Sequence, residues 1–224
     1  MTAIILFAFL CHESNVIKKR KLVTYMEKTL TAAEHKCKAL YSAAPGTPIV
    51  FLHGLSYTLD IWEQIGVTEL LIEKHVPFLA LDMPYGMRSK CQPKTRKPET
   101  NVSVAAEAIK SLFGAMVPIL VGASIGGHIA LMYAARFPVK GLLLVAPARA
   151  LTEDLLKNYE KFNFPVKIIW GSQDNVISGE EMRTLSDKLP NSKLLVYNGA
   201  GHSAYKDEPE QFKRDLLEFY ANAE

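Results

Sequence analysis

From about residue 48 onward, the chain alternates short apolar runs with longer amphipathic stretches. The apolar runs lie at 48–53, 76–82, 117–122, 139–146, 166–171 and 192–198. Helical periodicity occurs near 59–74, 101–114, 126–137, 178–189 and 207–221. Continuous apolar runs are typical of strands that are buried on both faces. The pattern therefore predicts an α/β fold, with a mostly parallel central sheet and helices on both faces.

The N-terminal part of the chain follows a different pattern. Residues 26–45 form two extended segments around a polar turn, which predicts an antiparallel hairpin at the sheet edge. We expect residues 26–224 to form a single domain and residues 1–25 to be an extension of uncertain role. The apolar run at 2–11 is shorter than the roughly 20 residues that span a bilayer, and its basic residues follow it. We therefore expect a terminal packing or mobile segment rather than an export signal.

Composition and charge narrow the classes of partner. Hydrophobic residues make up 49% of the chain and charged residues 22%, as in ordinary globular proteins. A net charge of +3 is too small to require a nucleic acid or an anionic membrane, so neither partner is expected. The basic runs at 18–21 and 88–97 are interpreted as solvated surface. For 88–97 the alternative is a field that attracts an anionic substrate.

The chain has three cysteines, Cys11, Cys37 and Cys91, which are widely separated. Their odd number and spacing indicate neither a disulfide framework nor a zinc site. This pattern favours a reducing compartment, and we expect a cytoplasmic protein.

The stretch "GASIGG" at 122–127 lies where a predicted strand gives way to a predicted helix. A dinucleotide fingerprint would need a glycine where Ser124 stands. Gly122, Ser124 and Gly126 instead fit the G-x-S-x-G spacing of a nucleophile elbow. In the alternative interpretation, the glycines only allow close packing and Ser124 caps the helix. The six residues alone leave both interpretations open.

Polar residues at the strand ends strengthen the first interpretation. Ligands of open parallel sheets bind beyond the carboxyl ends of the strands, and Ser124, Asp174 and His202 each follow a predicted strand. A serine nucleophile needs a base to take its proton and an acid to orient that base. Asp82 is the rival acid, but it precedes Ser124 in the chain and belongs to a turn motif.

Five motifs together resemble the α/β hydrolase superfamily over about residues 26–224. They are "FLHGLSYTLDIW" (51–62), "LDMPYGMRS" (81–89), "VGASIGGHIALMYAARFP" (121–138), "IIWGSQD" (168–174) and "GAGH" (199–202). The resemblance implies Ser124 as nucleophile, His202 as general base and then acid, and Asp174 as the orienting acid. It also implies an oxyanion hole made by the backbone N–H groups of Ile125 and Leu55, with Ser56 as the alternative to Leu55. It implies no metal and no organic cofactor.

The chain departs from the family pattern in two places. The family's D-x-P-G-x-G-x-S segment is "DMPYGMRS" here, so Tyr85 and Met87 replace glycines beside the expected site. Residues 147–166 have room for about one helix, near 151–162, so no cap domain is expected. This arrangement is similar to that of small capless hydrolases such as the CCG1-interacting factor B group. His128, on the helix after Ser124, is expected to be a packing or surface residue.

The leading hypothesis is a serine hydrolase that cleaves small carboxylic esters through an acyl-enzyme intermediate, with a small-molecule ester as its partner. Without a cap to bury long acyl chains, we expect acetyl to butyryl esters to be preferred. The alternatives are an amide or carbon–carbon bond hydrolase, an acyltransferase of the same fold, and a non-catalytic binding protein.

Overall fold

A computed structural model describes residues 16–20 and 23–223 of the chain. The expectations for the apolar run at 2–11 and for Cys11 lie outside these residues. The described residues form one nine-stranded sheet in the order β1-β2-β3-β5-β4-β6-β7-β8-β9. The strands are β1 (Val16–Arg20), β2 (Val23–Ala32), β3 (His35–Ser42), β4 (Ile49–Leu52), β5 (Phe78–Leu81), β6 (Ile119–Ala123), β7 (Gly141–Val145), β8 (Val166–Gly171) and β9 (Ser192–Tyr197).

The sheet is antiparallel at its N-terminal edge and parallel elsewhere. β1, β2, β3 and β5 pair antiparallel in succession, whereas the neighbouring strands from β5 to β9 pair parallel. The expected hairpin is present: Ala32 pairs with His35 across a turn in which Ala33 and Glu34 have positive φ angles of 45° and 65°. β2 begins at Val23, so the boundary expected before residue 26 falls inside this strand.

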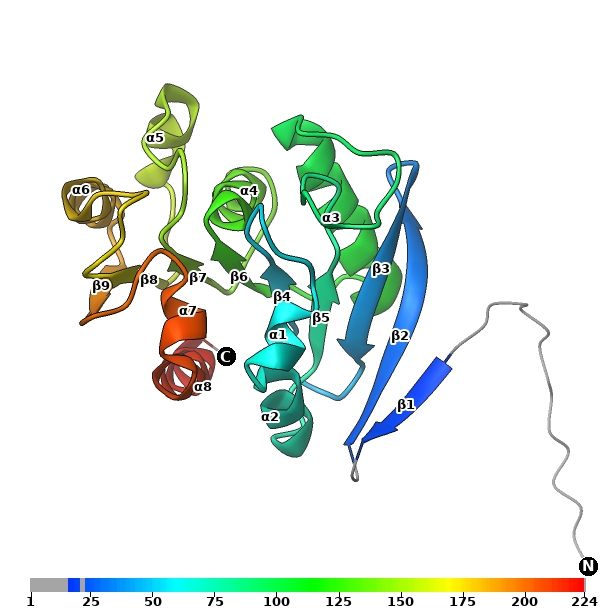
Figure 1. The fold of residues 1–224 in the computed structure, drawn as a ribbon. Coiled ribbons are helices and arrows are strands. Elements are labelled where there is room, and N and C mark those ends of the chain that lie inside the picture. The colour runs from blue at the N-terminus through cyan, green and yellow to red at the C-terminus, as the bar shows by residue number, and fades with distance from the viewer. Residues whose placement is uncertain (1–15, 21–22, 224) are drawn as a thin grey trace, which may run out of the picture.

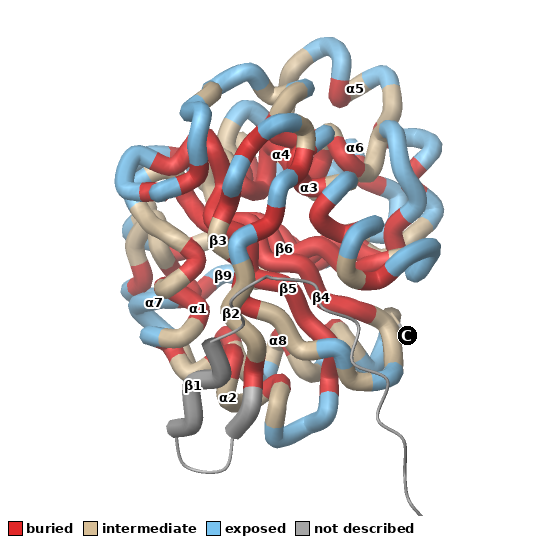
Figure 2. Tube along the Cα trace, turned by 90° about the vertical axis from the view of Figure 1, so that its right-hand side faces the viewer, coloured by how far each residue is buried: buried red, intermediate tan, exposed pale blue. Residues whose placement is uncertain are grey.

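Helices cover both faces of the sheet, as predicted (Figure 1). The helices are α1 (Ile61–Gln64), α2 (Val67–Glu73), α3 (Pro98–Phe113), α4 (Ile125–Ala134), α5 (Glu153–Tyr159), α6 (Gly179–Lys188), α7 (Ala204–Asp207) and α8 (Pro209–Ala223). α3, α4, α5 and α6 pack on one face, and α1, α2, α7 and α8 on the other. Along β4, Val50 and Leu52 enter the first core while Ile49 and Phe51 enter the second. Figure 2 shows the buried strands between the two helical layers.

Two predicted helices are each divided in the structure. The helix expected at 59–74 breaks into α1 and α2 at Gly66, whose φ of 73° is a left-handed conformation that glycine adopts without steric cost. The helix expected at 207–221 is divided into α7 and α8 at Glu208, because the residue before a proline, here Pro209, is disfavoured in helical conformation. No helix among the described residues has the length and apolar character needed to cross a bilayer.

The connection from β7 to β8 holds α5 and no further helix or strand. The absence of a cap domain at this position agrees with the sequence prediction, and α5 itself falls within the expected range of 151–162. No cap domain therefore covers the carboxyl edge of the sheet at this connection.

The cysteine interpretation was wrong for one pair, because Cys37 of β3 forms a disulfide with Cys91. The two residues are 54 positions apart, so their spacing in the chain does not indicate the pair. β3 pairs with β5, and a bridge between Lys36 and Gln92 then brings the loop after β5 beside β3. The disulfide weakens the cysteine argument for a reducing compartment, and the cytoplasmic location stays a prediction.

Candidate active site

Ser124 occupies a sharp turn between β6 and α4. Its φ of 52° and ψ of −115° are rare for a residue with a side chain. Its amide donates to the Val145 carbonyl at 2.9 Å, and its own carbonyl accepts from the amides of Gly127, His128 and Ala148 at 3.0, 3.2 and 3.0 Å. These four bonds hold the strained conformation and leave the side chain half-buried at the carboxyl edge of the sheet.

The glycines around Ser124 are required by close packing. A Cβ atom at Gly126 would lie 2.2 Å from the Leu52 carbonyl oxygen, and one at Gly122 would lie 2.6 Å from the Gly126 carbonyl oxygen. α4 thus begins directly against the end of β4. This contact brings Ile125, the first residue of α4, next to the loop that follows β4.

His202 and Asp174 form a hydrogen-bonded pair. His202 Nδ1 lies 2.8 Å from Asp174 Oδ2, and the Asp174 side chain is fully buried while 23% of the His202 side chain is exposed. The second carboxylate oxygen, Oδ1, accepts from the amides of Val176 and Ile177 at 2.8 and 3.0 Å. Because Nδ1 faces the carboxylate, Nε2 is the imidazole nitrogen that remains for other chemistry.

Contacts between the loops after β8 and β9, and between the latter loop and α7, bring this pair together. The Gln173 amide donates to the Ala200 carbonyl at 2.9 Å, and the Gly201 amide donates to Asp207 Oδ2 at 2.9 Å. A Cβ atom at Gly171 would lie 2.2 Å from the Gly201 carbonyl oxygen. The end of β8 therefore packs directly under the loop that carries His202.

Asp82, the rival acid, lies elsewhere. Its Oδ2 accepts from the Lys90 amide at 2.8 Å, and its Oδ1 lies 3.4 Å from Nε2 of the buried His53. Asp174 rather than Asp82 therefore contacts His202. Asp82 holds the start of the loop that connects β5 to α3.

Ser124 and His202 line one pocket of about 300 Å³. Its other lining residues are Gly54, Leu55, Ser56, Tyr57, Ala123, Val176, Ser203 and Tyr205. A larger hollow of about 700 Å³ lies between the C-terminal ends of α3 and α4, but none of the expected site residues line it. Because it contains Ser124 and His202, the smaller pocket is the candidate active site.

Part of this pocket was not expected from the sequence. Tyr57 Oη and Ser203 Oγ lie 3.0 Å apart, which joins the loop after β4 to the residue after His202. Val176 and Tyr205 complete the wall, whereas neither α5 nor residues 85–89, the segment that departs from the family pattern, are among its lining residues. The only signal in the sequence was proximity, since Tyr57 lies within a recognised motif and the other three follow one by a few residues, namely Val176, Ser203 and Tyr205.

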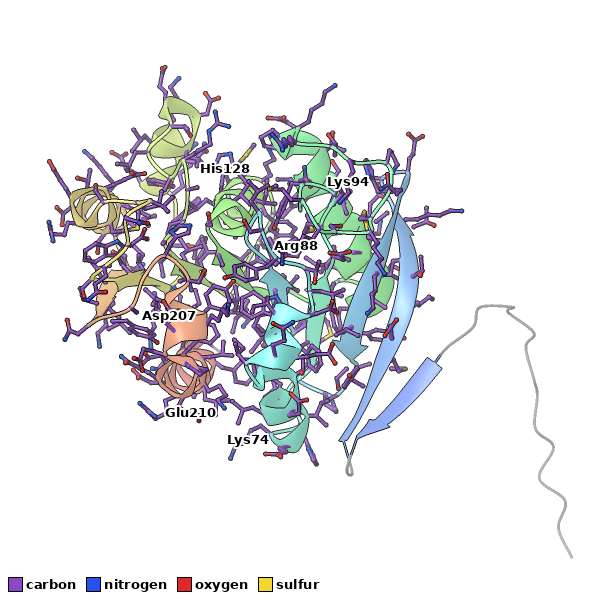
Figure 3. The ribbon with its side chains drawn as sticks, viewed as in Figure 1. Lys74, Arg88, Lys94, His128, Asp207 and Glu210 are labelled. Atoms are coloured by element: carbon purple, nitrogen blue, oxygen red, sulfur yellow. A yellow bond between two sulfur atoms is a disulfide. The ribbon has the colours of Figure 1, made fainter. Side chains whose placement is uncertain are left out.

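Two other features of the sequence, His128 and the basic loop with Lys94, do not line this pocket. Figure 3 labels both residues. His128 is a buried packing residue of α4, and burial, together with the charge of Arg149, lowers its pKa. In the basic loop, Lys94 donates to the carbonyls of Gly86, at 2.6 Å, and Ser89, so this cation stabilises the loop itself. No group of three or more His, Cys, Asp or Glu side chains suited to a metal ion occurs among the described residues.

Comparison with known proteins gives several matches. The model of the alpha/beta hydrolase family matches residues 49–165. Protein ABHD14A of Danio rerio is 30% identical over 179 residues, which cover 78% of this chain and 64% of that protein. The human protein named "Putative protein-lysine deacylase ABHD14B" is 26% identical over 182 residues, which cover 76% of this chain and 81% of that protein. The chain thus spans less than two thirds of ABHD14A.

Solved structures share the fold. A CIB-like hydrolase from Thermoplasma acidophilum matches with a TM-score of 0.79 at 22% identity, over 93% of this chain and 100% of that chain. An esterase from Exiguobacterium antarcticum matches with a TM-score of 0.74 at 19% identity, over 86% of this chain and 98% of that chain. The family model covers more than half of the 224 residues, including the turn at Ser124. This chain therefore belongs to the alpha/beta hydrolase family.

Proposed function

We propose that the chain is a serine hydrolase that removes small acyl groups from esters through an acyl-enzyme. The observation that carries this proposal is the 2.8 Å hydrogen bond between His202 and Asp174 in a site where His202 and Ser124 line the same pocket. Asp174 orients the imidazole and stabilises its protonated form. His202 Nε2 then takes the proton from Ser124 as the serine oxygen attacks the substrate carbonyl carbon.

The two half-reactions balance with water as the only further reactant. Attack by Ser124 Oγ forms a tetrahedral intermediate, which collapses as His202 gives its proton to the departing alcohol. Water, deprotonated by the same imidazole, then attacks the acyl-enzyme and releases the carboxylic acid. The Ile125 amide suits the oxyanion because it is one of the first N–H groups of α4, which have no partner within the helix.

The size of the pocket supports a small acyl group. Its volume of about 300 Å³ is at the lower end of the range for small-molecule sites. Each buried methylene contributes about 0.8 kcal/mol, but only where an apolar wall receives it. Val176 is 63% exposed at the rim, so the wall ends there. Acetyl to butyryl esters are the proposed substrates.

A second candidate is the removal of an acyl group from a lysine amine. It is favoured by the name of a relative, the "Putative protein-lysine deacylase ABHD14B". The same groups serve amide hydrolysis, with His202 protonating the departing amine instead of an alcohol. A solvent-exposed rim such as Val176 is also compatible with a substrate that is part of a larger protein.

A fluorophosphonate probe and a substrate series test these proposals together. We expect one adduct, on Ser124, in intact-protein and peptide mass spectrometry. For p-nitrophenyl esters of two to sixteen carbons, kcat/KM should be highest between two and four carbons. An acetyl-lysine peptide assayed beside p-nitrophenyl acetate distinguishes the two candidates.

No adduct on Ser124 and no hydrolysis of either substrate would favour the binding-protein alternative. A steady rise in kcat/KM to the longest esters would contradict the small pocket. Hydrolysis of the peptide at a kcat/KM comparable to that of the ester would favour the second candidate.

A further inference from the structure

Tyr85 lies where the family pattern has glycine, and the residue is only 4% exposed. Its hydroxyl donates to the His53 carbonyl at 2.6 Å, and its ring centroid lies 5.2 Å from that of the His53 imidazole. We propose that Tyr85 is a positioning residue that holds residues 53–55, the oxyanion loop, so that the Leu55 amide faces the reacting carbonyl. This inference rests on the proposed serine hydrolase function.

Each carbonyl of the oxyanion loop has a hydrogen-bond donor. The His53 carbonyl accepts from the Tyr85 hydroxyl, and the Leu55 carbonyl accepts from the Met87 amide at 2.8 Å. Tyr85, through its hydroxyl, and Met87, through its backbone amide, therefore hold the loop at both ends. The Gly54 carbonyl, between them, is bound by the His53 ring.

The His53 imidazole completes this arrangement. Its Nδ1 lies 2.8 Å from the Gly54 carbonyl oxygen, which can only accept, so Nδ1 carries the proton. Its Nε2 accepts from the Met83 amide at 2.9 Å. The Tyr57 amide also donates to the Gly54 carbonyl, at 3.1 Å. The orientation of the peptide that joins Gly54 to Leu55 is thus fixed from its carbonyl side.

The direction of the Leu55 amide follows from this geometry. In a trans peptide the N–H points opposite to the C=O, so the Leu55 N–H points away from the groups that bind the Gly54 carbonyl. A Cβ atom at Gly54 would lie 3.8 Å from Ser124 Cβ, so this peptide lies beside the proposed nucleophile. Within the described part of the chain, no protein group accepts a hydrogen bond from the Leu55 amide. This N–H is therefore available to an oxyanion.

Loss of the Tyr85 hydroxyl should affect the transition state more than the bound ester. The oxyanion loop has no helix or strand of its own, so its peptides keep their orientation through these few bonds. A tilted Leu55 amide stabilises the tetrahedral oxyanion less, whereas the planar ester carries little charge on the same oxygen. The predicted effect is a lower kcat at a nearly unchanged KM.

The test is Tyr85→Phe, with Tyr159→Phe as its matched control. Tyr159 is also a buried tyrosine whose hydroxyl donates to a backbone carbonyl, that of Ala150, and it does not line the pocket. With p-nitrophenyl acetate, Tyr85→Phe should lower kcat about 10- to 100-fold and change KM less than about twofold. Inhibition by n-butylboronic acid, which forms a tetrahedral adduct on serine, should weaken by a similar factor. Tyr159→Phe should change kcat less than about twofold.

A second variant covers the case in which Tyr85→Phe does not fold. A chain with 4-aminophenylalanine in place of Tyr85 keeps the ring and a weaker N–H donor. We expect its kcat to be lower than that of the wild type, because the donor is weaker, again without a change in KM. A wild-type kcat in this chain, when Tyr85→Phe cannot be measured, would overturn the proposal.

The remaining outcomes separate this inference from the proposed function. If wild-type Ser124 reacts with the fluorophosphonate but folded Tyr85→Phe keeps its kcat and its boronate affinity, Tyr85 has no positioning role and the proposed function still stands. Equal losses of kcat in Tyr85→Phe and Tyr159→Phe would indicate a general effect of stability and overturn the inference. If wild-type Ser124 does not react at all, the proposed function fails first.

Discussion

His202 Nδ1 and Asp174 Oδ2 lie 2.8 Å apart, although 28 positions separate the two residues in the chain. The carboxylate is fully buried, and its other oxygen accepts hydrogen bonds from the backbone amides of Val176 and Ile177. The loop after β8 therefore holds the carboxylate in place beside the histidine. The hydrogen bond to this carboxylate fixes the orientation of the imidazole and leaves Nε2 for the substrate.

Replacing Asp174 by asparagine should lower kcat for p-nitrophenyl acetate by about 10²- to 10⁴-fold, because an amide favours the wrong imidazole tautomer and cannot stabilise the imidazolium. Steady-state kinetics on the purified variant measures the loss. Asp82→Asn is the comparison, and we expect it to cost much less. A neutral Asp174→Asn beside an inactive Asp82→Asn would reverse the assignment of the acid.

Ser124→Ala should lower kcat at least about 10³-fold with the fold intact. Ser124→Gly should be equally inactive but more stable than Ser124→Ala by about 1 kcal/mol, because glycine adopts a φ of 52° without the steric cost that a Cβ brings. Urea denaturation of both variants gives the difference in unfolding free energy. If the glycine variant were the less stable one, the turn would not be strained.

Removal of the disulfide should destabilise the fold. The bond between Cys37 and Cys91 closes a loop of 54 residues, and cross-links of this kind stabilise by about 2–4 kcal/mol. We expect the double variant Cys37→Ala, Cys91→Ala to lose about that much unfolding free energy in urea, with Cys11→Ala as the control for loss of a single cysteine. Equal stability of the double variant and the wild type under oxidising conditions would contradict the cross-link.

His128 should make the fold less stable in acid. Burial lowers its pKa, so the unfolded chain binds a proton more readily than the folded chain as the pH falls below about 6.5. Unfolding free energy should therefore fall between about pH 7 and pH 5. The slope of unfolding free energy against pH should be smaller in His128→Phe, by up to about 1.4 kcal/mol per pH unit, which is the contribution of one proton. Urea titrations at several pH values measure it.

The exposed His75 provides the control for this measurement. His75 has a φ of 57°, which asparagine tolerates, so His75→Asn should fold and control for the loss of a histidine. An unchanged slope in His128→Phe would show that other groups set the acid sensitivity.

Most of the sheet could be predicted because the central strands are buried on both faces, and such strands consist of continuous apolar runs. The predicted run at 166–171 coincides with β8, and the others differ from the observed strands by one or two residues at their ends. The candidate site could be predicted for a related reason. Ser124, Asp174 and His202 each follow a strand, and parallel strands bring their carboxyl ends to one edge.

The features that escaped prediction depend on contacts between distant residues. Cys37 meets Cys91 only after β3 has paired with β5, and nothing in their spacing reveals that register. The bond between Tyr57 and Ser203 likewise joins two loops 146 positions apart. Tyr85 was visible as a departure from the family pattern, but its hydrogen bond to His53 required the structure.

β7 and β8 pair along a line, the seam, with a different part of the candidate site on each side of it in the chain. Ser124 and Leu55 precede this seam, and Asp174 and His202 follow it, while the only helix between the two strands is α5, which begins with the exposed Glu153 and Asp154. A chain cleaved in α5 would leave the nucleophile on one fragment and its base and acid on the other. Ester hydrolysis by the mixed fragments would then report that they had reassembled along this seam.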